Sequence, residues 1–264
     1  MSGMGRLING LLKPAGVEMR RVRPPEPDLR YDSTVAEVEA LVRQSLFRAI
    51  PANPTRIPLL CQLLGTQIVE AMHLLNELHQ CIGLEGDICE FGIAQGATSA
   101  LIANEIRNTE KKLWLFDSFK GLPKPSEKDR LIDDIFSLGT MDKYHGTMAC
   151  PETDVLGRMK AIDFPLDRIN IVPGYIEKSS KKASLPPKVA FAYVDFDFYE
   201  PILITLRLLA NRLPLEGRVM VDDYGWFSEG AQVAVDEFVK EDPRFEMVLP
   251  PAGSGHFAML RRAR

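Results

Sequence analysis

The sequence predicts an α/β fold: a mostly parallel sheet of seven strands, helices on both of its faces, and a helical cover at the N-terminus. Two observations support this fold class. From residue 86 onward, apolar segments of strand length alternate with helical segments, which is typical of parallel sheets covered on both faces. The segment 189–194 is apolar throughout, as expected for a strand buried on both sides.

The N-terminal part of the chain, residues 1–80, is expected to form an arm and a helical cover rather than a separate domain. Residues 1–30 hold a short apolar patch between basic residues, followed by prolines that interrupt any helix. Such a segment fits an arm that packs on a partner subunit, or a loose tail, better than contact with a membrane surface. Residues 33–49 and 56–80 carry helical apolar patterns. The main domain is then expected to span residues 81–264.

Strands and helices are expected to alternate in order along the main domain. The strands are short, apolar and rich in β-branched and aromatic residues, and they are expected at 87–93, 112–119, 168–176, 189–197, 217–224, 245–251 and 256–262. Helices are expected between them, at 96–106, 201–211 and 230–241. A long polar stretch, 124–150, follows the second strand and matches no regular element.

The composition excludes several classes of protein. The 264 residues are 45% apolar with a formal charge of −4, so a full core can form and no basic excess points to a nucleic-acid partner. No apolar run reaches the roughly 20 residues of a membrane helix, and the start lacks the features of a signal peptide. The four cysteines form no CxxC pair and are interpreted as free thiols. We therefore expect a cytoplasmic protein in a reducing compartment.

The end of the first strand carries a candidate cofactor turn. Glu90, Gly92 and Gly96 form the pattern ExGxxxG before a helix. Gly92 lets backbone approach a ligand, and the helix that begins at Gly96 offers N–H donors to a carboxylate. The pattern differs from the dinucleotide fingerprint GxGxxG. A cofactor with an amino-acid end fits better, with Glu90 at its ammonium group, while a purely structural turn is the alternative.

The next two strand ends carry weaker signals for the same cofactor. Asp117, followed by Ser118, stands where a carboxylate can accept hydrogen bonds from both hydroxyls of a ribose. The third strand ends in Gly174 and Tyr175. That glycine lets an adenine lie against backbone, and Tyr175 supplies an apolar wall. A helix cap and a structural turn are the respective alternatives.

The fourth and fifth strands each end in a pair of aspartates. Asp195 and Asp197 follow one strand, and Asp222 and Asp223 follow the other. Carboxylates gathered at one edge of a sheet repel one another, and a hard divalent cation such as Mg²⁺ relieves this repulsion. Such a cation lowers the pKa of an acceptor hydroxyl. Strand alternation predicts that Asp195 and Asp197 point the same way, so we assign Asp195 to the metal and Asp197 to the general base, with the exchange of these roles left open. Helix capping together with solvated loops is the alternative for both pairs.

These motifs resemble the macrocin O-methyltransferase (TylF/MycF) family over roughly residues 85–240. GDICEFGIAQG resembles its GD-x-x-E-x-G-x-x-x-G opening, and LFDSFKGLP resembles its DSF-x-GLP segment. VDFDFYE and VMVDDYG resemble its two acidic stretches, and all four motifs occur in the same order.

The resemblance implies a class I methyltransferase fold of the Rossmann-like type, S-adenosylmethionine as cofactor, and Mg²⁺. It implies methylation of a hydroxyl on a sugar or glycosylated small molecule, and a homodimer or higher homo-oligomer. By position, cofactor binding falls on Glu90, Gly92 and Asp117. The metal ligands are then Asp195, Asp222 and Asp223, and the base is Asp197.

Two other functions stay open at this point. An α/β enzyme that binds a nucleotide or NAD is one, and the missing GxGxxG counts against it. A methyltransferase-fold protein that binds without catalysis is the other, because fold alone does not imply activity. His145 and His256 are interpreted as surface or packing residues.

Overall fold

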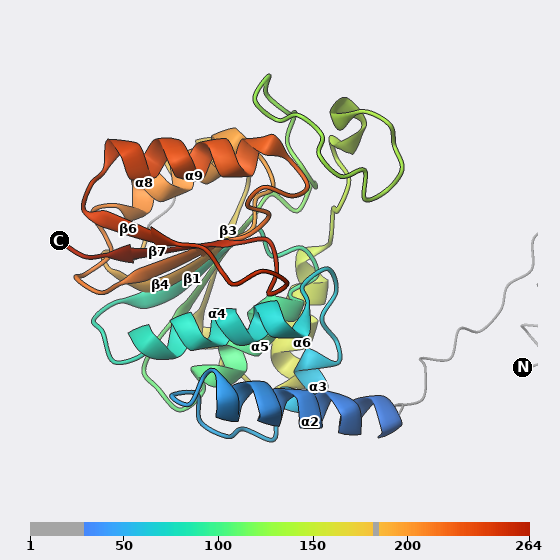
Figure 1. Cartoon of the computed structure of the whole chain (residues 1–264), viewed down its shortest axis with the longest axis vertical. Helices are drawn as coiled ribbons and strands as arrows, with labels where there is room; N and C mark the ends of the chain where they lie inside the picture. The colour runs from blue at the N-terminus through green and yellow to red at the C-terminus, as the bar shows by residue number, and fades with distance from the viewer. Residues whose placement is uncertain (1–28, 182–184) are drawn as a thin grey trace, which may run out of the picture.

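The computed structural model describes residues 29–181 and 185–264, so the predicted arm at 1–28 lies outside the described residues. Its centre is a seven-stranded sheet in the order β3-β2-β1-β4-β5-β7-β6 (Figure 1). The strands are β1 Asp87–Phe91, β2 Leu113–Asp117, β3 Ile169–Pro173, β4 Val189–Val194, β5 Arg218–Val221, β6 Phe245–Val248 and β7 Ala258–Arg262. β7 runs antiparallel to both of its neighbours, β5 and β6, and the other described pairings are parallel. The predicted fold class is confirmed.

The sheet is held together by apolar residues that alternate between its two faces. In β4, Phe191 and Tyr193 join one hydrophobic cluster, whereas Ala192 and Val194 join the other. All residues of β4 are buried. A central parallel strand has no solvent-facing side, so the sequence cannot alternate with polar residues there.

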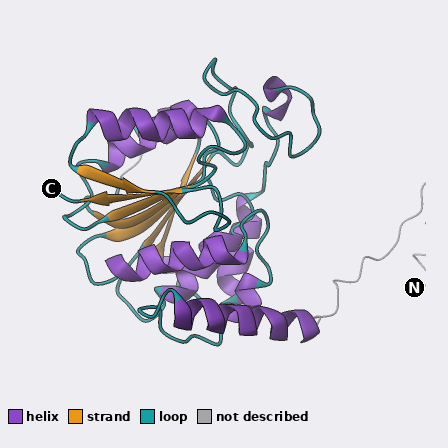
Figure 2. Ribbon diagram, in the orientation of Figure 1, coloured by secondary structure: helices purple, strands orange, loops and turns teal. Residues whose placement is uncertain are grey.

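Helices cover both faces of the sheet, as Figure 2 shows. On one side lie α8 and α9, and on the other lie α4, α5 and α6, with α2 and α3 outermost (Figure 1). Their bounds are α2 Leu29–Ser45, α3 Arg56–Leu60, α4 Ile68–Cys81, α5 Ala97–Glu105, α6 Glu152–Ala161, α7 Ile176–Ser179, α8 Tyr199–Leu209 and α9 Glu229–Glu241. Two 3₁₀ turns, Met141–Tyr144 and Leu166–Arg168, complete the described elements.

The helical cover differs from its prediction in detail. The helix expected at 33–49 begins at Leu29 and ends at Ser45, and the helix expected at 56–80 is split into α3 and α4. The split falls near Gly65, whose φ of +87° is incompatible with a continuous helix. The apolar face of α4 packs directly on the sheet, in the same cluster as Phe191 and Met220.

A buried ion cluster fastens this cover to the main domain. Arg56, which is 0% exposed, binds Glu105 of α5 through Nη2 at 2.7 Å and through Nε at 2.8 Å. Its Nη1 binds Glu39 of α2 at 2.6 Å. His79 of α4 contacts Glu105 at 2.9 Å. Three helices therefore meet at one guanidinium group, and α4 joins the cluster through Glu105.

Two predictions about the chain as a whole can be checked on the described residues. Within residues 29–181 and 185–264, no helix combines the length and the apolar character needed to cross a membrane. All four cysteines are free thiols, as predicted.

Candidate active site

The carboxyl ends of the parallel strands meet at one edge of the sheet, on the floor of a cavity of about 650 Å³. Backbone hydrogen bonds continue the pairing past the strand ends: the Asp195 N–H donates to the Phe91 carbonyl at 2.7 Å, and the Asp222 N–H donates to the Val194 carbonyl at 2.8 Å. The volume is in the usual range for ligand sites, about 300–1,000 Å³. Most of the predicted site residues border this cavity: Gly92, Asp117, Ser118, Tyr175, Asp195, Asp197, Asp222 and Asp223.

Three predicted cofactor residues do not border the cavity. Gly96 is the N-cap of α5, and a Cβ there would lie 3.1 Å from Val155 of α6, so this glycine allows close helix packing. Gly174 forms the turn before Tyr175, which does border the cavity. Glu90 is fully buried at the end of β1.

Glu90 carries a carboxylate oxygen without a partner. Its Oε1 accepts a hydrogen bond from the Thr98 hydroxyl, whereas its Oε2 is buried with no hydrogen-bond partner. Burial raises the pKa of Glu90 to about 7, although the hydroxyls of Ser99 and Thr98 in α5 act to lower it. An unpartnered buried acceptor is costly unless a donor reaches it. This oxygen therefore agrees with the predicted ammonium partner in its chemistry, but Glu90 does not itself border the cavity.

Gly92 lets the first turn pass close to the loop after β4. Its φ is +80°, and a Cβ at this position would lie 1.7 Å from the Asp195 carbonyl oxygen. Any side chain here would push the cofactor turn away from the aspartates. Gly92 was predicted to let backbone approach a ligand, which stays a prediction, whereas the close approach in the structure is to the protein's own backbone.

Replacing Gly92 with Ala is expected to lower the free energy of unfolding by at least about 1–3 kcal/mol, the usual cost of a strained backbone. The matched control is Gly157→Ala in α6, where nothing lies within 4 Å of the new Cβ. That change removes a helix-interior glycine and is expected to stabilise by up to about 1 kcal/mol. Urea unfolding of both variants measures the contrast, and equal effects would show that the turn relaxes freely.

Asp117 holds the cofactor turn in place. Its Oδ2 accepts hydrogen bonds from the N–H groups of Ile93 at 2.9 Å and Ala94 at 3.2 Å, and its Oδ1 accepts one from Phe119 at 2.7 Å. The Ser118 hydroxyl donates to the Gly121 carbonyl at 2.9 Å and closes the following turn. Both residues border the cavity and also order its walls.

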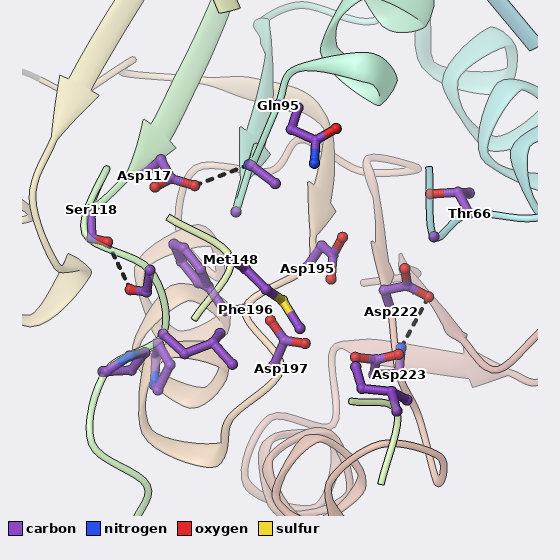
Figure 3. A pocket seen from close by; sticks show the side chains of 18 of the residues that line it. Thr66, Gln95, Asp117, Ser118, Met148, Asp195, Phe196, Asp197, Asp222 and Asp223 are labelled. Carbon is purple, nitrogen blue, oxygen red and sulfur yellow. Dashed lines mark hydrogen bonds between the residues drawn. The ribbon is translucent and has the colours of Figure 1, made fainter. Parts of the chain in front are cut away.

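The predicted aspartates converge opposite this turn. Figure 3 shows Asp117 and Ser118 on one side of the cavity, Asp222 and Asp223 on the other, and Asp195 between them.

The three carboxylates that come together most closely belong to Asp195, Asp197 and Asp223, each with an oxygen within 4.8 Å of the others. Strand alternation was predicted to point Asp195 and Asp197 the same way, and this explanation is wrong. β4 ends at Val194, so strand alternation does not orient these residues. Instead Asp197 and Asp223 adopt left-handed backbone conformations, with φ of +61° and +59°. Asp tolerates this region better than most residues, and the turns aim both carboxylates into the site.

Asp222 borders the cavity but lies outside that close group. Its Oδ2 accepts a hydrogen bond from the buried Tyr193 hydroxyl at 2.6 Å, and its Oδ1 accepts one from the Asp223 N–H at 3.0 Å. Tyr193 gave no signal in the sequence, because an aromatic residue in a buried strand is ordinarily part of the core. Here its hydroxyl fixes the orientation of Asp222.

The site is strongly negative. Burial and the charges of Asp222 and Asp223 raise the pKa of Asp195 well above its usual range, and burial and Asp195 do the same for Asp197. Burial and Asp197 also raise the pKa of Asp223. The described residues that border the cavity include no Lys or Arg and seven acids: Glu70, Asp117, Glu177, Asp195, Asp197, Asp222 and Asp223. Carboxylate oxygens are ligands that a hard divalent cation prefers, so the donor set fits the predicted metal.

Part of the cavity wall is apolar, and the sequence did not predict which residues form it. Ile135, Phe136 and Met148 come from the stretch 124–150, and Trp226 stacks on His256 with ring centroids 5.5 Å apart. His256 was interpreted as a surface or packing residue. It borders the cavity because β7 is antiparallel, so its start lies at the edge where β5 ends.

Comparisons with known proteins agree with this architecture. The family model described as macrocin-O-methyltransferase (TylF) matches residues 54–246. A tetracenomycin 4'-O-methyltransferase from Streptomyces olivaceus, named for a dimethoxyrhamnosyl substrate, is 26% identical over 57% of this chain and 59% of its own length. Mycinamicin III 3''-O-methyltransferase from Micromonospora griseorubida is 26% identical over 58% of this chain and 63% of its own.

A solved structure shows the same fold. The O-methyltransferase NovP superposes with a TM-score of 0.64 at 23% identity, over 75% of this chain and 81% of that chain. The matched region spans about three fifths of the length of the two sequence relatives. The family match, in contrast, covers most of this chain and includes all four acidic strand ends. The chain belongs to the macrocin O-methyltransferase (TylF) family.

Proposed function

We propose that this protein is an S-adenosylmethionine- and Mg²⁺-dependent O-methyltransferase that acts on a hydroxyl of a sugar or glycosylated small molecule. The observation that carries the proposal is the charge of the cavity: seven acids and no Lys or Arg among the described residues that border it. Such a cavity attracts cationic ligands and repels phosphates. It favours a sulfonium cofactor with an ammonium group over the pyrophosphate of NAD.

The proposed roles follow the strand ends. The cofactor half of the site is formed or supported by residues at the first three strand ends, together with Asp195. These residues are Glu90, Gly92, Gly96, Asp117, Ser118, Gly174 and Tyr175. Asp195, Asp222 and Asp223 hold the divalent cation, and Asp197 is the general base. Family membership supports this division of roles.

The chemistry divides between the ligands and the chain. When bound, S-adenosylmethionine would supply an electrophilic methyl group, and its sulfonium sulfur is a leaving group that needs no help from an acid. When bound, Mg²⁺ makes a hydroxyl more acidic and orients its oxygen. Asp197 would accept the proton that the acceptor hydroxyl loses when its oxygen is methylated. The apolar walls from Phe136 and Met148 limit the entry of water. Alignment of the two reacting atoms supplies the rest of the rate.

A thermal-shift comparison tests the cofactor class. S-adenosylhomocysteine at about 100 times its Kd is expected to add roughly 2.7 kcal/mol of stability and raise Tm, because it binds only the folded protein. NAD at the same concentration is expected to leave Tm unchanged. A rise in Tm with NAD alone would favour the nucleotide-binding alternative. If calorimetric titration with S-adenosylmethionine releases no heat, with or without Mg²⁺, a non-catalytic binding protein would be favoured.

The acceptor is proposed from the relatives. Their names place the methyl group on oxygen, in one case on a rhamnosyl-bearing compound. Incubation of the protein with labelled methyl donor and cellular extract, with and without EDTA, identifies the acceptor by mass. Self-association as a homodimer stays a prediction that light scattering can check.

A further inference from the structure

Glu70, in the first turn of α4, brings a carboxylate from the helical cover to the acidic edge of the cavity. The residue is 6% exposed, and its Oε1 is buried without a hydrogen-bond partner. Burial, the charges of Asp222 and Asp223, and a side-chain hydrogen bond with Asp222 all raise the pKa of this carboxyl. A buried carboxylate in such surroundings is unfavourable unless a cation or a proton compensates it.

A role in capping α4 accounts for only part of this geometry. Glu70 is the third residue of the helix, from which a side chain reaches back to the N-cap residue, and it interacts with the backbone N–H of Gln67. That interaction leaves Oε1 without a partner. Capping from this position also needs no charge, because Gln serves there as well as Glu. The negative charge therefore calls for another explanation.

No described side chain around Glu70 supplies the missing positive charge. His73, on the same helix, is enclosed by the rings of Phe47 and Phe257 at 4.7 and 5.1 Å, and burial lowers its pKa. The loop before β7 closes on the other side, where a Cβ at Gly255 would lie 3.1 Å from Glu70 Oε2. Among the described residues that border the cavity, none is Lys or Arg. A bound cation, or a proton shared with Asp222, is therefore what remains to compensate this carboxylate.

We propose that Glu70 is a further carboxylate of the divalent-cation site, in an outer position that acts through hydrogen-bonded water at Oε1. This rests on the proposed Mg²⁺ dependence. The outer position follows because Glu70 is absent from the close group of Asp195, Asp197 and Asp223. Thr66, which precedes α4, lies on the same side of the cavity as Asp222 (Figure 3). Cation binding would thus draw the helical cover onto the loops after β4 and β5.

Titration of Mn²⁺, followed by electron paramagnetic resonance, tests the role of Glu70 without an activity assay. The Glu70→Gln variant keeps the cap and removes the charge, and it is expected to bind Mn²⁺ about tenfold to a hundredfold more weakly than wild type, as for outer residues of other metal sites. Its Tm without cation is expected to be equal or higher, because one repelling carboxylate is gone. The control, Glu110→Gln, removes an equal charge from an exposed position and is expected to bind Mn²⁺ normally.

The outcomes separate this inference from the proposed function. Wild-type affinity for Mn²⁺ in Glu70→Gln would overturn the role of Glu70 and leave the metal site intact. No binding of Mn²⁺ by wild type would overturn the proposed metal dependence as well. If Glu70→Gln does not fold, Glu70→Asp keeps the charge but withdraws it by one methylene. Weakened Mn²⁺ binding in that variant supports the proposal, and unchanged binding overturns it.

Discussion

Replacing Asp197 with Asn is expected to lower kcat for methyl transfer by about 10²–10⁴-fold, the usual contribution of a positioned general base. Asn keeps the size of the side chain but does not accept the hydroxyl proton. Binding of S-adenosylhomocysteine and of Mn²⁺ should stay near wild type, because the proposed ligands are Asp195, Asp222 and Asp223. Steady-state kinetics and Mn²⁺ titration on the same preparations measure both properties.

The matched comparison is Asp222→Asn, which is expected to weaken Mn²⁺ binding and to lose activity that added metal partly restores. The structure makes this comparison necessary, because Asp197 and not Asp222 belongs to the closest group of carboxylates. If Asp197→Asn loses Mn²⁺ affinity and Asp222→Asn retains it, the two roles are exchanged. If Asp222→Asn methylates the acceptor normally without metal, the proposed metal dependence is wrong.

Replacing Arg56 with Met is expected to lower the free energy of unfolding by about 3–5 kcal/mol, because two buried carboxylates lose the cation they share and keep only their contacts with Arg43 and His79. Arg56 is fully buried between Glu39 and Glu105. The control is Arg207→Met on α8, where a half-exposed guanidinium pairs with Glu241. Exposed pairs contribute about 0–1 kcal/mol. Urea unfolding at neutral pH measures both, and equal losses would contradict the prediction.

The effect of Arg56 should also depend on pH. Burial acts to raise the pKa of Glu105, but hydrogen bonds from His79 and Arg56 outweigh it and lower the pKa below its usual value. A carboxyl with a lowered pKa stabilises the folded state above its unfolded pKa, about 4.3 for Glu. This stabilisation disappears as the pH falls below that value. The difference between wild type and Arg56→Met should therefore shrink as the pH falls below about 4.

Much of the fold could be predicted because its signals are local. Apolar strands such as 189–194 must be buried on both faces, and Gly92 and the aspartates stand next to strand ends that topology brings to one edge. The predictions were wrong where a pattern that holds within one strand or helix was applied beyond the end of that element. Strand alternation was applied to Asp197, although β4 ends three residues earlier. A single helix was expected across Gly65, where the backbone is left-handed.

The site residues that escaped prediction depend on distant packing. In the sequence, Glu70 has the position of an ordinary helix-capping residue, and Tyr193 has the position of an aromatic core residue. Each meets Asp222 only after α4 and β5 have packed beside β4. His256 reaches the cavity because β7 is inserted antiparallel beside β5.

The α/β fold and the strand-end motifs that mark the family are visible in the sequence, because burial patterns and turns are properties of neighbouring residues. Three features appear only in the folded chain: which carboxylates lie closest together, which of them already accept hydrogen bonds, and that Glu70 of the helical cover borders the cavity. Charge repulsion, desolvation and hydrogen bonding act over a few ångströms in space, between residues that the chain order keeps far apart.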